Sequence, residues 1–160
     1  MGHGIIISGF QGIGKTTYAK SHPNTVDLES SNFDKTNEKW YLDYCRTALD
    51  LMEKGHTVFV SSHKIVRDYL LRQTPYYIMV CPTMEMKDVW IQDLADRYKM
   101  DPTPKNYRAW KAAEFDYDNY IKEISEDKYL QVYWIKSTNE RYLSDDMMAS
   151  IWKAVSAAYK

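Results

Sequence analysis

A glycine-rich stretch near the start of the chain, GFQGIGKTT at residues 9–17, constrains the fold more than any other feature. It follows residues 4–8 (GIIIS), a short apolar run typical of a buried strand. It leads into residues 14–20, which we predict to be a short helix. A buried strand, a glycine loop and a helix in this order predict the first unit of an α/β domain.

The glycine loop matches a known phosphate-binding pattern. Gly9, Gly14, Lys15 and Thr16 fit G-x-x-x-x-G-K-[ST], in the strand-to-helix context that this pattern requires. The dinucleotide pattern G-x-G-x-x-G is not met, because Thr17 stands where its third glycine would be. We therefore predict a loop whose backbone N–H groups surround a polyphosphate, as in sites that bind ATP.

The side chains after the glycines have separate expected tasks. Lys15 is placed to reach the β- and γ-phosphates of ATP, and the Thr16 hydroxyl is placed to ligate Mg²⁺. Thr17 is expected to donate to the α-phosphate. Gln11 is either a solvated side chain or a residue that orients a water or the γ-phosphate. The residues expected to line the phosphates are Gly9, Gln11, Gly12, Ile13, Gly14, Lys15, Thr16 and Thr17.

The rest of the chain alternates between strand and helix patterns, which predicts parallel strands with helices on both faces of the sheet. The predicted strands cover residues 4–8, 25–29, 57–61, 76–81 and 129–137. The predicted helices cover residues 14–20, 37–54, 63–73, 84–99, 106–124 and 144–159. Ser61 or Ser62 is expected to cap the third of these helices, and Ser144 the last.

Residues 84–125 break the alternation, because they place two helices between the fourth and fifth strands. We interpret them as a helical insertion within one domain that spans residues 1–160. The insertion contains a locally basic stretch with Arg97, Lys99, Lys105, Arg108 and Lys111. Either these side chains form a solvated helix face, or they meet phosphate.

Two carboxylates follow the second predicted strand. Asp27 and Glu29 alternate along VDLES, which places both on one face if the strand continues through them. The third strand ends instead in Ser61, Ser62 and His63, with no acid. Asp27 and Glu29 are either solvated acids at a strand end or the carboxylates that a phosphate loop needs beside its metal.

This arrangement resembles the P-loop nucleoside and nucleotide kinase superfamily, especially its small members similar to shikimate, gluconate and adenylate kinases. The layout also resembles nucleotide-kinase-like ATP-binding proteins encoded by bacteriophages. The resemblance implies a three-layer P-loop NTPase fold with strand order 2-3-1-4-5. It further implies that residues 84–111 close over the phosphates as a lid. Only residues 9–17 form a specific motif.

The resemblance also implies roles for particular residues. Asp27 becomes the candidate base or metal-shell residue with Glu29 as its partner, and Arg97 becomes the phosphate-contacting lid arginine. Arg108, and less directly Lys99, are further lid candidates, and Arg67 stands where related kinases keep a substrate-binding arginine. The loop after the fifth strand would contact adenine, with Asn139 and Tyr142 as candidates. His63 is either a packing residue or a substrate contact.

The chain departs from its relatives in two places that bear on the acceptor. It lacks the pair of closely spaced lid arginines of adenylate kinases, and it lacks the Asp-Arg pair that follows the third strand in deoxynucleoside kinases. The leading prediction is an ATP- and Mg²⁺-dependent phosphotransferase acting on a nucleoside or nucleoside monophosphate. Phosphorylation of a polynucleotide 5′ end and non-catalytic ATP binding are the alternatives, and the oligomeric state is left open.

Composition narrows these options. The net charge of −1, from 21 basic and 22 acidic residues, disfavours a constitutive nucleic-acid binder. No apolar run reaches the ~18 residues of a membrane span, and the first strand is too short for a signal-peptide core. The two cysteines have no metal-binding spacing. We therefore expect a cytoplasmic protein with no disulfide and no membrane partner.

Overall fold

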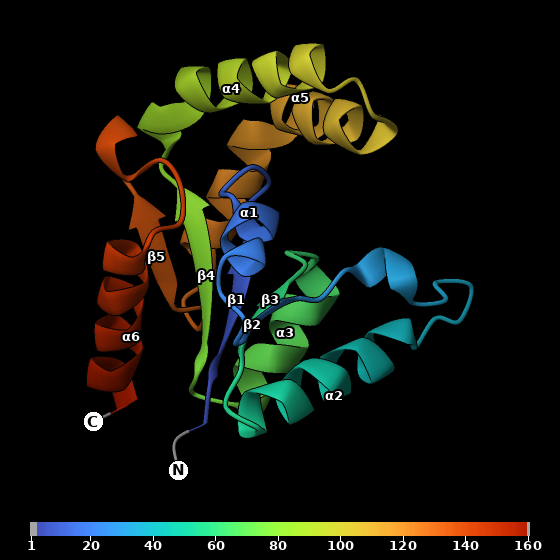
Figure 1. Ribbon diagram of the computed structural model, residues 1–160, viewed down its shortest axis with the longest axis vertical. Coiled ribbons are helices and arrows are strands. Elements are labelled where there is room, and N and C mark those ends of the chain that lie inside the picture. Colours follow the sequence, from blue (N-terminus) through green and yellow to red (C-terminus); the bar gives the residue numbers. More distant parts are fainter. Residues whose placement is uncertain (1–2, 160) are drawn as a thin grey trace.

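Five parallel strands form one sheet in the computed structural model, which describes residues 3–159. Their order is β2-β3-β1-β4-β5, which confirms the predicted order and is consistent with the P-loop NTPase fold (Figure 1). The strands are β1 Ile5–Gly9, β2 Thr25–Asp27, β3 Thr57–Val60, β4 Tyr77–Pro82 and β5 Val132–Ile135.

The central strands are buried on both faces, as their unbroken apolar sequences predict. Every residue of β1 and β4 is buried, and Ile6 of β1 stands in register with Val58 of β3 and Tyr77 of β4. Because all five strands run the same way, their carboxyl ends meet at one edge of the sheet. The phosphate loop leaves β1 at that edge.

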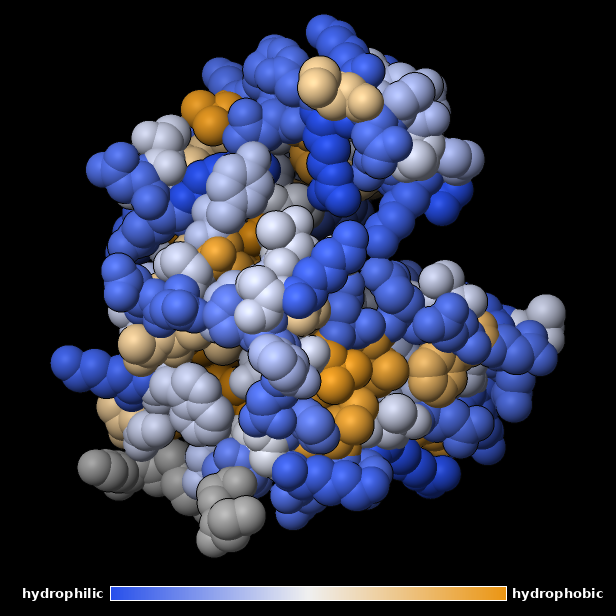
Figure 2. Space-filling view, in the orientation of Figure 1, coloured by the Kyte–Doolittle hydropathy of each residue, from blue (hydrophilic) through white to orange (hydrophobic). Residues whose placement is uncertain are grey.

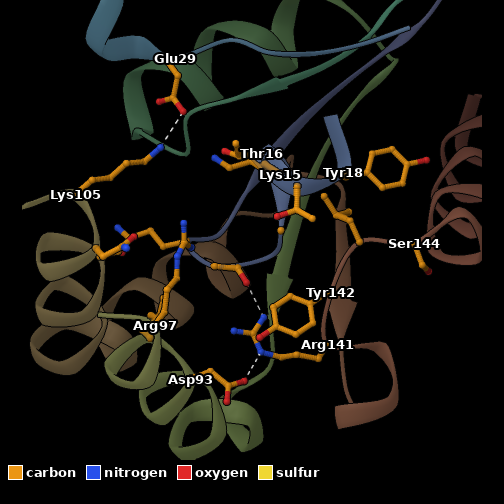
Figure 3. Close-up of a pocket in the computed structure, with 18 of the residues that line it drawn as sticks. Lys15, Thr16, Tyr18, Glu29, Asp93, Arg97, Lys105, Arg141, Tyr142 and Ser144 are labelled. Atoms are coloured by element: carbon orange, nitrogen blue, oxygen red, sulfur yellow. Dashed lines mark hydrogen bonds and ion pairs between the residues drawn. The ribbon is translucent and has the colours of Figure 1, made fainter. Parts of the chain in front are cut away.

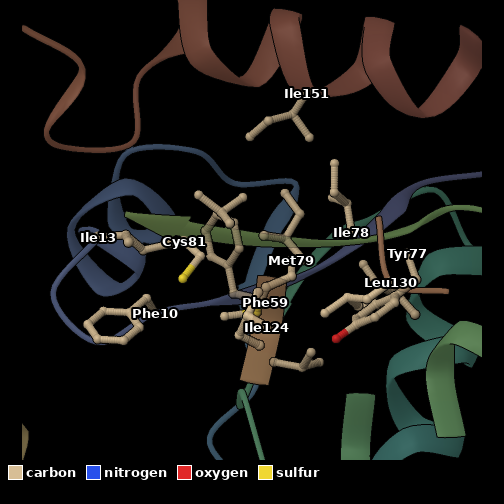
Figure 4. Packing of buried hydrophobic residues seen from close by; sticks show 14 of the residues in the cluster. Phe10, Ile13, Phe59, Tyr77, Ile78, Met79, Cys81, Ile124, Leu130 and Ile151 are labelled. Atoms are coloured by element: carbon tan, nitrogen blue, oxygen red, sulfur yellow. The ribbon is translucent and has the colours of Figure 1, made fainter. Parts of the chain in front are cut away.

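Helices cover both faces of the sheet. Figure 4 shows α6 on one side of the buried strands, with Ile151 pointing at them, and α2 and α3 on the other side. The helices are α1 Lys15–Lys20, α2 Trp40–Glu53, α3 Lys64–Gln73, α4 Lys87–Met100, α5 Pro104–Glu126 and α6 Asp145–Tyr159, with short 3-10 turns η1 Ser30–Asn32, η2 Met84–Met86 and η3 Thr138–Glu140.

The predicted helical insertion consists of η2, α4 and α5, which lie over the carboxyl edge of the sheet (Figure 1). Its two helices pack against each other and are separated by a sharp break. Pro104 starts α5, and the Thr103 hydroxyl caps it by accepting a hydrogen bond from the Asn106 amide at 3.1 Å. A proline in the first turn with a threonine cap makes α5 begin at a fixed point.

Several boundaries differ from the sequence-based expectation. Strand β2 ends at Asp27, so Glu29 belongs to the connection to η1, and β5 is only the central part of the predicted 129–137. The serine cap expected for α3 is wrong, because His63 is the cap residue and its side chain accepts no hydrogen bond from the helix amides. The Ser144 cap is confirmed, since its hydroxyl accepts from the Met147 amide at 3.1 Å.

One buried tyrosine of α2 fastens the ends of β2 and β3. The Tyr44 hydroxyl donates to the Leu28 carbonyl at 2.5 Å and accepts from the Ser61 amide at 2.8 Å. Tyr44 is fully buried, so neither backbone group has easy access to water as a replacement. This hydroxyl therefore sets the spacing between the segment that carries Asp27 and the segment that starts α3.

No helix in residues 3–159 is both long enough and apolar enough to cross a membrane. Cys45 and Cys81 are both free thiols, and both are buried.

We predict that Tyr44→Phe lowers the free energy of unfolding by about 1–3 kcal/mol, because it removes the partner of two partly buried backbone groups, the Ser61 amide and the Leu28 carbonyl. Urea denaturation of the purified variant measures this change. Tyr41→Phe, on the same helix but only half-buried and with no hydroxyl contact in the structure, is the matched control and should change stability by less than about 0.5 kcal/mol. Equal stability of the two variants would contradict the role of Tyr44.

Candidate nucleotide-binding site

Three successive carbonyl groups of the phosphate loop, those of residues 11–13, accept hydrogen bonds from partners elsewhere in the chain. The Gln11 carbonyl accepts from the Trp90 indole N–H at 2.7 Å, and the Gly12 carbonyl accepts from the Arg141 guanidinium at 2.7 Å. The Ile13 carbonyl accepts from the Leu143 amide at 2.9 Å. Helix α4 and the segment that follows η3 thus hold the loop from outside.

The amide groups of the same loop are oriented the other way. Within residues 3–159, no group accepts a hydrogen bond from the amides of residues 11–17. Gly12 and Gly14 adopt φ angles of 87° and 94°, which side chains other than glycine rarely allow, and these angles reverse the peptide direction. Unpaired amides gathered on one side of a loop form a site for an anion such as phosphate.

Lys15 begins α1 at the mouth of this loop. Desolvation of its ammonium group lowers its pKa from the ordinary value, and the carboxylates of Asp27 and Glu29 oppose this by raising the pKa. A desolvated cation beside unpaired amides gains strongly from an anion that enters the site. The charge balance around Lys15 thus favours binding of a polyphosphate.

Thr16 and Asp27 form the second half of the phosphate site. The Thr16 hydroxyl donates to a carboxylate oxygen of Asp27 at 2.8 Å, so two oxygen ligands of the kind that Mg²⁺ prefers lie together beside the loop. A hydroxyl and a carboxylate supply only part of an octahedral shell, which leaves positions for phosphate oxygens and water. These two residues fit a magnesium ion that arrives with a nucleotide.

A cavity of about 1000 Å³ extends from the loop along the underside of the insertion (Figure 3). Figure 2 shows it as a notch between the insertion at the top and the part of the molecule below, bordered by hydrophilic side chains. Small-molecule sites range over about 300–1000 Å³, so this volume accommodates a nucleotide together with a second ligand. The lining comes from the loop and α1, from α4 and α5, and from the segment after η3.

The insertion supplies cations to the cavity. Arg97 of α4 and Lys105 and Arg108 of α5 line it, opposite the phosphate loop. Lys105 reaches across the notch to Glu29, with 3.0 Å between its ammonium nitrogen and a carboxylate oxygen (Figure 3). This ion pair is the contact that joins the tip of the insertion to the segment after β2.

The side of the cavity beyond α1 is aromatic and acidic. The rings of Tyr18 and His22 stack with centroids 3.7 Å apart, and both side chains bond to one carboxylate oxygen of Asp145, at 3.0 and 2.7 Å. Tyr142, which is 55% exposed, also lines the cavity. Flat rings around an open end of a phosphate site suit a nucleobase.

The structure brings most of the predicted site residues together, but not all. The predicted residues that line the cavity are Gln11, Gly12, Gly14, Lys15, Thr16, Thr17, Glu29, Arg97, Arg108 and Tyr142. Gly9 and Ile13 lie beneath the loop, and Asp27 is reached through Thr16. Lys99, His63 and Asn139 are not part of the lining.

Arg67 also lies outside the cavity lining. It is 2% exposed, and one of its terminal nitrogens forms an ion pair with Glu123 of α5. Its guanidinium lies 5.6 Å from the Tyr120 ring, and the Tyr120 hydroxyl donates to the Ser62 carbonyl at 3.0 Å. The other two guanidinium nitrogens have no hydrogen-bond partner in the described chain, so this cation keeps unused donors behind the end of β3.

Sequence reasoning missed the pairing of Lys105 with Glu29, and it missed several residues that shape the site: Tyr18, His22, Trp90, Asp93, Arg141, Leu143 and Asp145. In the sequence, Trp90 is marked only as an apolar residue of the helix predicted over residues 84–99. Arg141 belongs to no recognisable sequence motif. The sequence indicates only that it follows the last strand, whose carboxyl end lies at the same sheet edge as the phosphate loop.

Comparison with protein-family models gives no match for this chain, and comparison with curated proteins gives none either.

We predict that the pKa values of two histidines near the site are shifted in opposite directions. Hydrogen bonds to the Tyr18 carbonyl and to Asp145 raise the pKa of His22 above 6.5, whereas desolvation and the cations Lys35 and Lys15 lower the pKa of His63 below 6.5. Proton NMR of the imidazole rings as a function of pH measures both values. Asp145→Asn should bring the His22 pKa down toward 6.5 and leave that of His63 unchanged.

The two shifts have opposite consequences for stability. The contribution of His22 is complete below its unfolded pKa and is lost as the pH rises through its folded pKa. At His63, stability is lost as the pH falls below its unfolded pKa. An unshifted His22 in the wild-type chain would contradict the Asp145 contact.

Proposed function

We propose that this chain is an ATP-dependent phosphotransferase that transfers the γ-phosphate of ATP to a nucleoside or nucleoside monophosphate. The observation that carries the proposal is the set of unpaired amides at residues 11–17, beside the desolvated Lys15 and the bonded pair Thr16 and Asp27. Donors for phosphate and ligands for magnesium occur together there, as transfer from a nucleoside triphosphate requires.

On the donor side, the loop amides and Lys15 would hold the β- and γ-phosphates. Thr16 would hold Mg²⁺, which neutralises phosphate charge when it is bound, and Asp27 would either join this metal shell or serve as the base for the acceptor. The aromatic side of the cavity, with Tyr18 and Tyr142, would receive the base. Arg97 lines the opposite wall, where it would neutralise charge on the phosphoryl group during transfer.

On the acceptor side, transfer forms a bond between an acceptor oxygen and the γ-phosphorus and breaks the bond from that phosphorus to the β-phosphate oxygen. The acceptor proton would pass to the Asp27 carboxylate, with Glu29 beside it, and ADP would leave with the electron pair of the broken bond. The insertion would exclude water, which competes with the acceptor.

A cation of the insertion would recognise an anionic acceptor. Arg108 borders the notch, whereas Arg67, with its two unpaired guanidinium nitrogens, is 2% exposed and lies outside the cavity lining. A phosphate on the acceptor would pair with the planar donors of arginine, which bind such groups in a bidentate manner. This favours a monophosphate over an uncharged nucleoside.

A polynucleotide 5′ end is the second candidate acceptor. The notch is open at its side (Figure 2). The outer part of the insertion clusters Tyr98, Tyr107 and Trp110 with Lys111, whose ammonium lies 4.0 Å from the centre of the Trp110 ring. Rings with interleaved cations are typical of surfaces that stack single-stranded bases. Transfer to an oligonucleotide but not to mononucleotides would favour this candidate.

We predict that the wild-type chain transfers labelled γ-phosphate from ATP to a member of a nucleoside and nucleotide panel. Lys15→Ala should reduce this transfer by about 100-fold or more, because it removes the cation at the phosphates. Lys20→Ala, an exposed change at the other end of α1, is the matched control and should keep full activity. Tight ATP binding without transfer to any acceptor would contradict the proposal and favour a non-catalytic nucleotide-binding module.

A second prediction concerns the carboxylate. Asp27→Asn should keep ATP affinity within about tenfold, or ~1.4 kcal/mol, yet remove turnover, because the amide cannot accept the acceptor proton. Equilibrium binding and single-turnover transfer measure the two effects separately. Asp43→Asn, an exposed change on α2, serves as control. Unchanged turnover in Asp27→Asn would remove Asp27 from the mechanism.

A further inference from the structure

The guanidinium of Arg141 contacts two aromatic rings beside the phosphate loop, those of Trp90 and Tyr142; Figure 3 shows it next to Tyr142. Its central carbon is 3.4 Å from the centre of the Trp90 ring and 4.3 Å from that of Tyr142. The residue is only 6% exposed. A planar cation in contact with two rings has little freedom to reorient, so its N–H groups point in fixed directions.

Those N–H groups join two separate elements. The Arg141 Nε donates to a carboxylate oxygen of Asp93 on α4 at 2.8 Å, and one terminal nitrogen donates to the Gly12 carbonyl at 2.7 Å. Removing Asp93 from this partly buried pair would leave the buried Arg141 charge with less compensation, which is costly. A lysine would keep the charge but could not make both contacts from one fixed plane.

Asp93 stands one helical turn before Arg97, and both residues line the cavity. Residues four apart on a helix lie on the same face, so fixing Asp93 also fixes the direction from which Arg97 approaches the loop. Within residues 3–159, no carboxylate forms an ion pair with Arg97. Arg97 is therefore positioned by its helix and is available to a phosphate.

We propose that Arg141 is a positioning residue that aims Arg97 at the γ-phosphate. It holds α4 through Asp93 and the phosphate loop through Gly12, so the distance between Arg97 and the loop is fixed before a nucleotide binds. The inference rests on the proposed ATP site, but it requires neither turnover nor a known acceptor. It gives Arg141 a specific effect, which is to distinguish a nucleoside triphosphate from a diphosphate.

The test measures binding of ADP and of a non-hydrolysable ATP analogue, each with Mg²⁺, to the full chain by calorimetry. The wild type should prefer the triphosphate by about tenfold or more, and Arg97→Ala should remove most of that preference. Arg141→Lys should reduce the preference about fivefold or more while ADP affinity changes less than about threefold. In the Arg97→Ala background, adding Arg141→Lys should change the preference by less than about twofold.

Asp93→Asn provides a second variant that keeps Arg141 and its ring contacts, so the test does not depend on the folding of Arg141→Lys. It should reduce the triphosphate preference in the same way. Arg46→Lys, an exposed change on α2, is the matched control and should alter neither affinity.

Equal losses of both nucleotides in Arg141→Lys and Asp93→Asn would overturn the inference and show a merely structural role. Persistence of the Arg141→Lys effect without Arg97 would overturn it as well, as would equal affinity of the wild type for the two nucleotides. Absence of phosphoryl transfer, by contrast, would contradict the kinase proposal and leave these binding results decisive for Arg141.

Discussion

The site depends on one constraint, which is that the carbonyls at the tip of the phosphate loop, those of residues 11–13, must find donors away from the phosphate site. A peptide group has two ends, so amides can gather around an anion only when their carbonyls are satisfied on the other side. Trp90, Arg141 and Leu143 meet this need. The insertion and the segment after η3 therefore do more than cover the loop, because they complete its hydrogen bonding and thereby give it its shape.

Much of the fold could be predicted because its signals are local. An apolar run such as Ile5–Ile7 can only be buried, and the glycine loop that follows β1 fixes a strand-to-helix turn. Boundaries were less accurate where polar and apolar residues mix, as in β2 and β5. In these two strands, the strand length is decided by pairing with a neighbouring strand, and the sequence of one segment does not show which residues will pair.

The part of the site formed by the phosphate-loop motif could be predicted from the sequence. The remainder could be predicted only in part. Lys15 and Thr16 act from positions that the loop itself defines. Arg141 acts from a segment 129 residues away from Gly12, and its role follows from a hydrogen bond that only the folded chain creates. Arg67 illustrates the reverse case, since its expected position in sequence does not place it in the cavity lining.

The contact between Lys105 and Glu29 spans the notch with both side chains largely in water, at 61% and 40% exposure. Exposed ion pairs contribute about 0–1 kcal/mol and weaken as salt screens them. Thermal motion readily breaks an ion pair this weak, so forms with the pair made and with the pair broken would both be well populated. The outer end of the insertion would then move toward and away from the segment after β2. Its base would stay in place, because Trp90 and Asp93 bond to the phosphate loop and to Arg141.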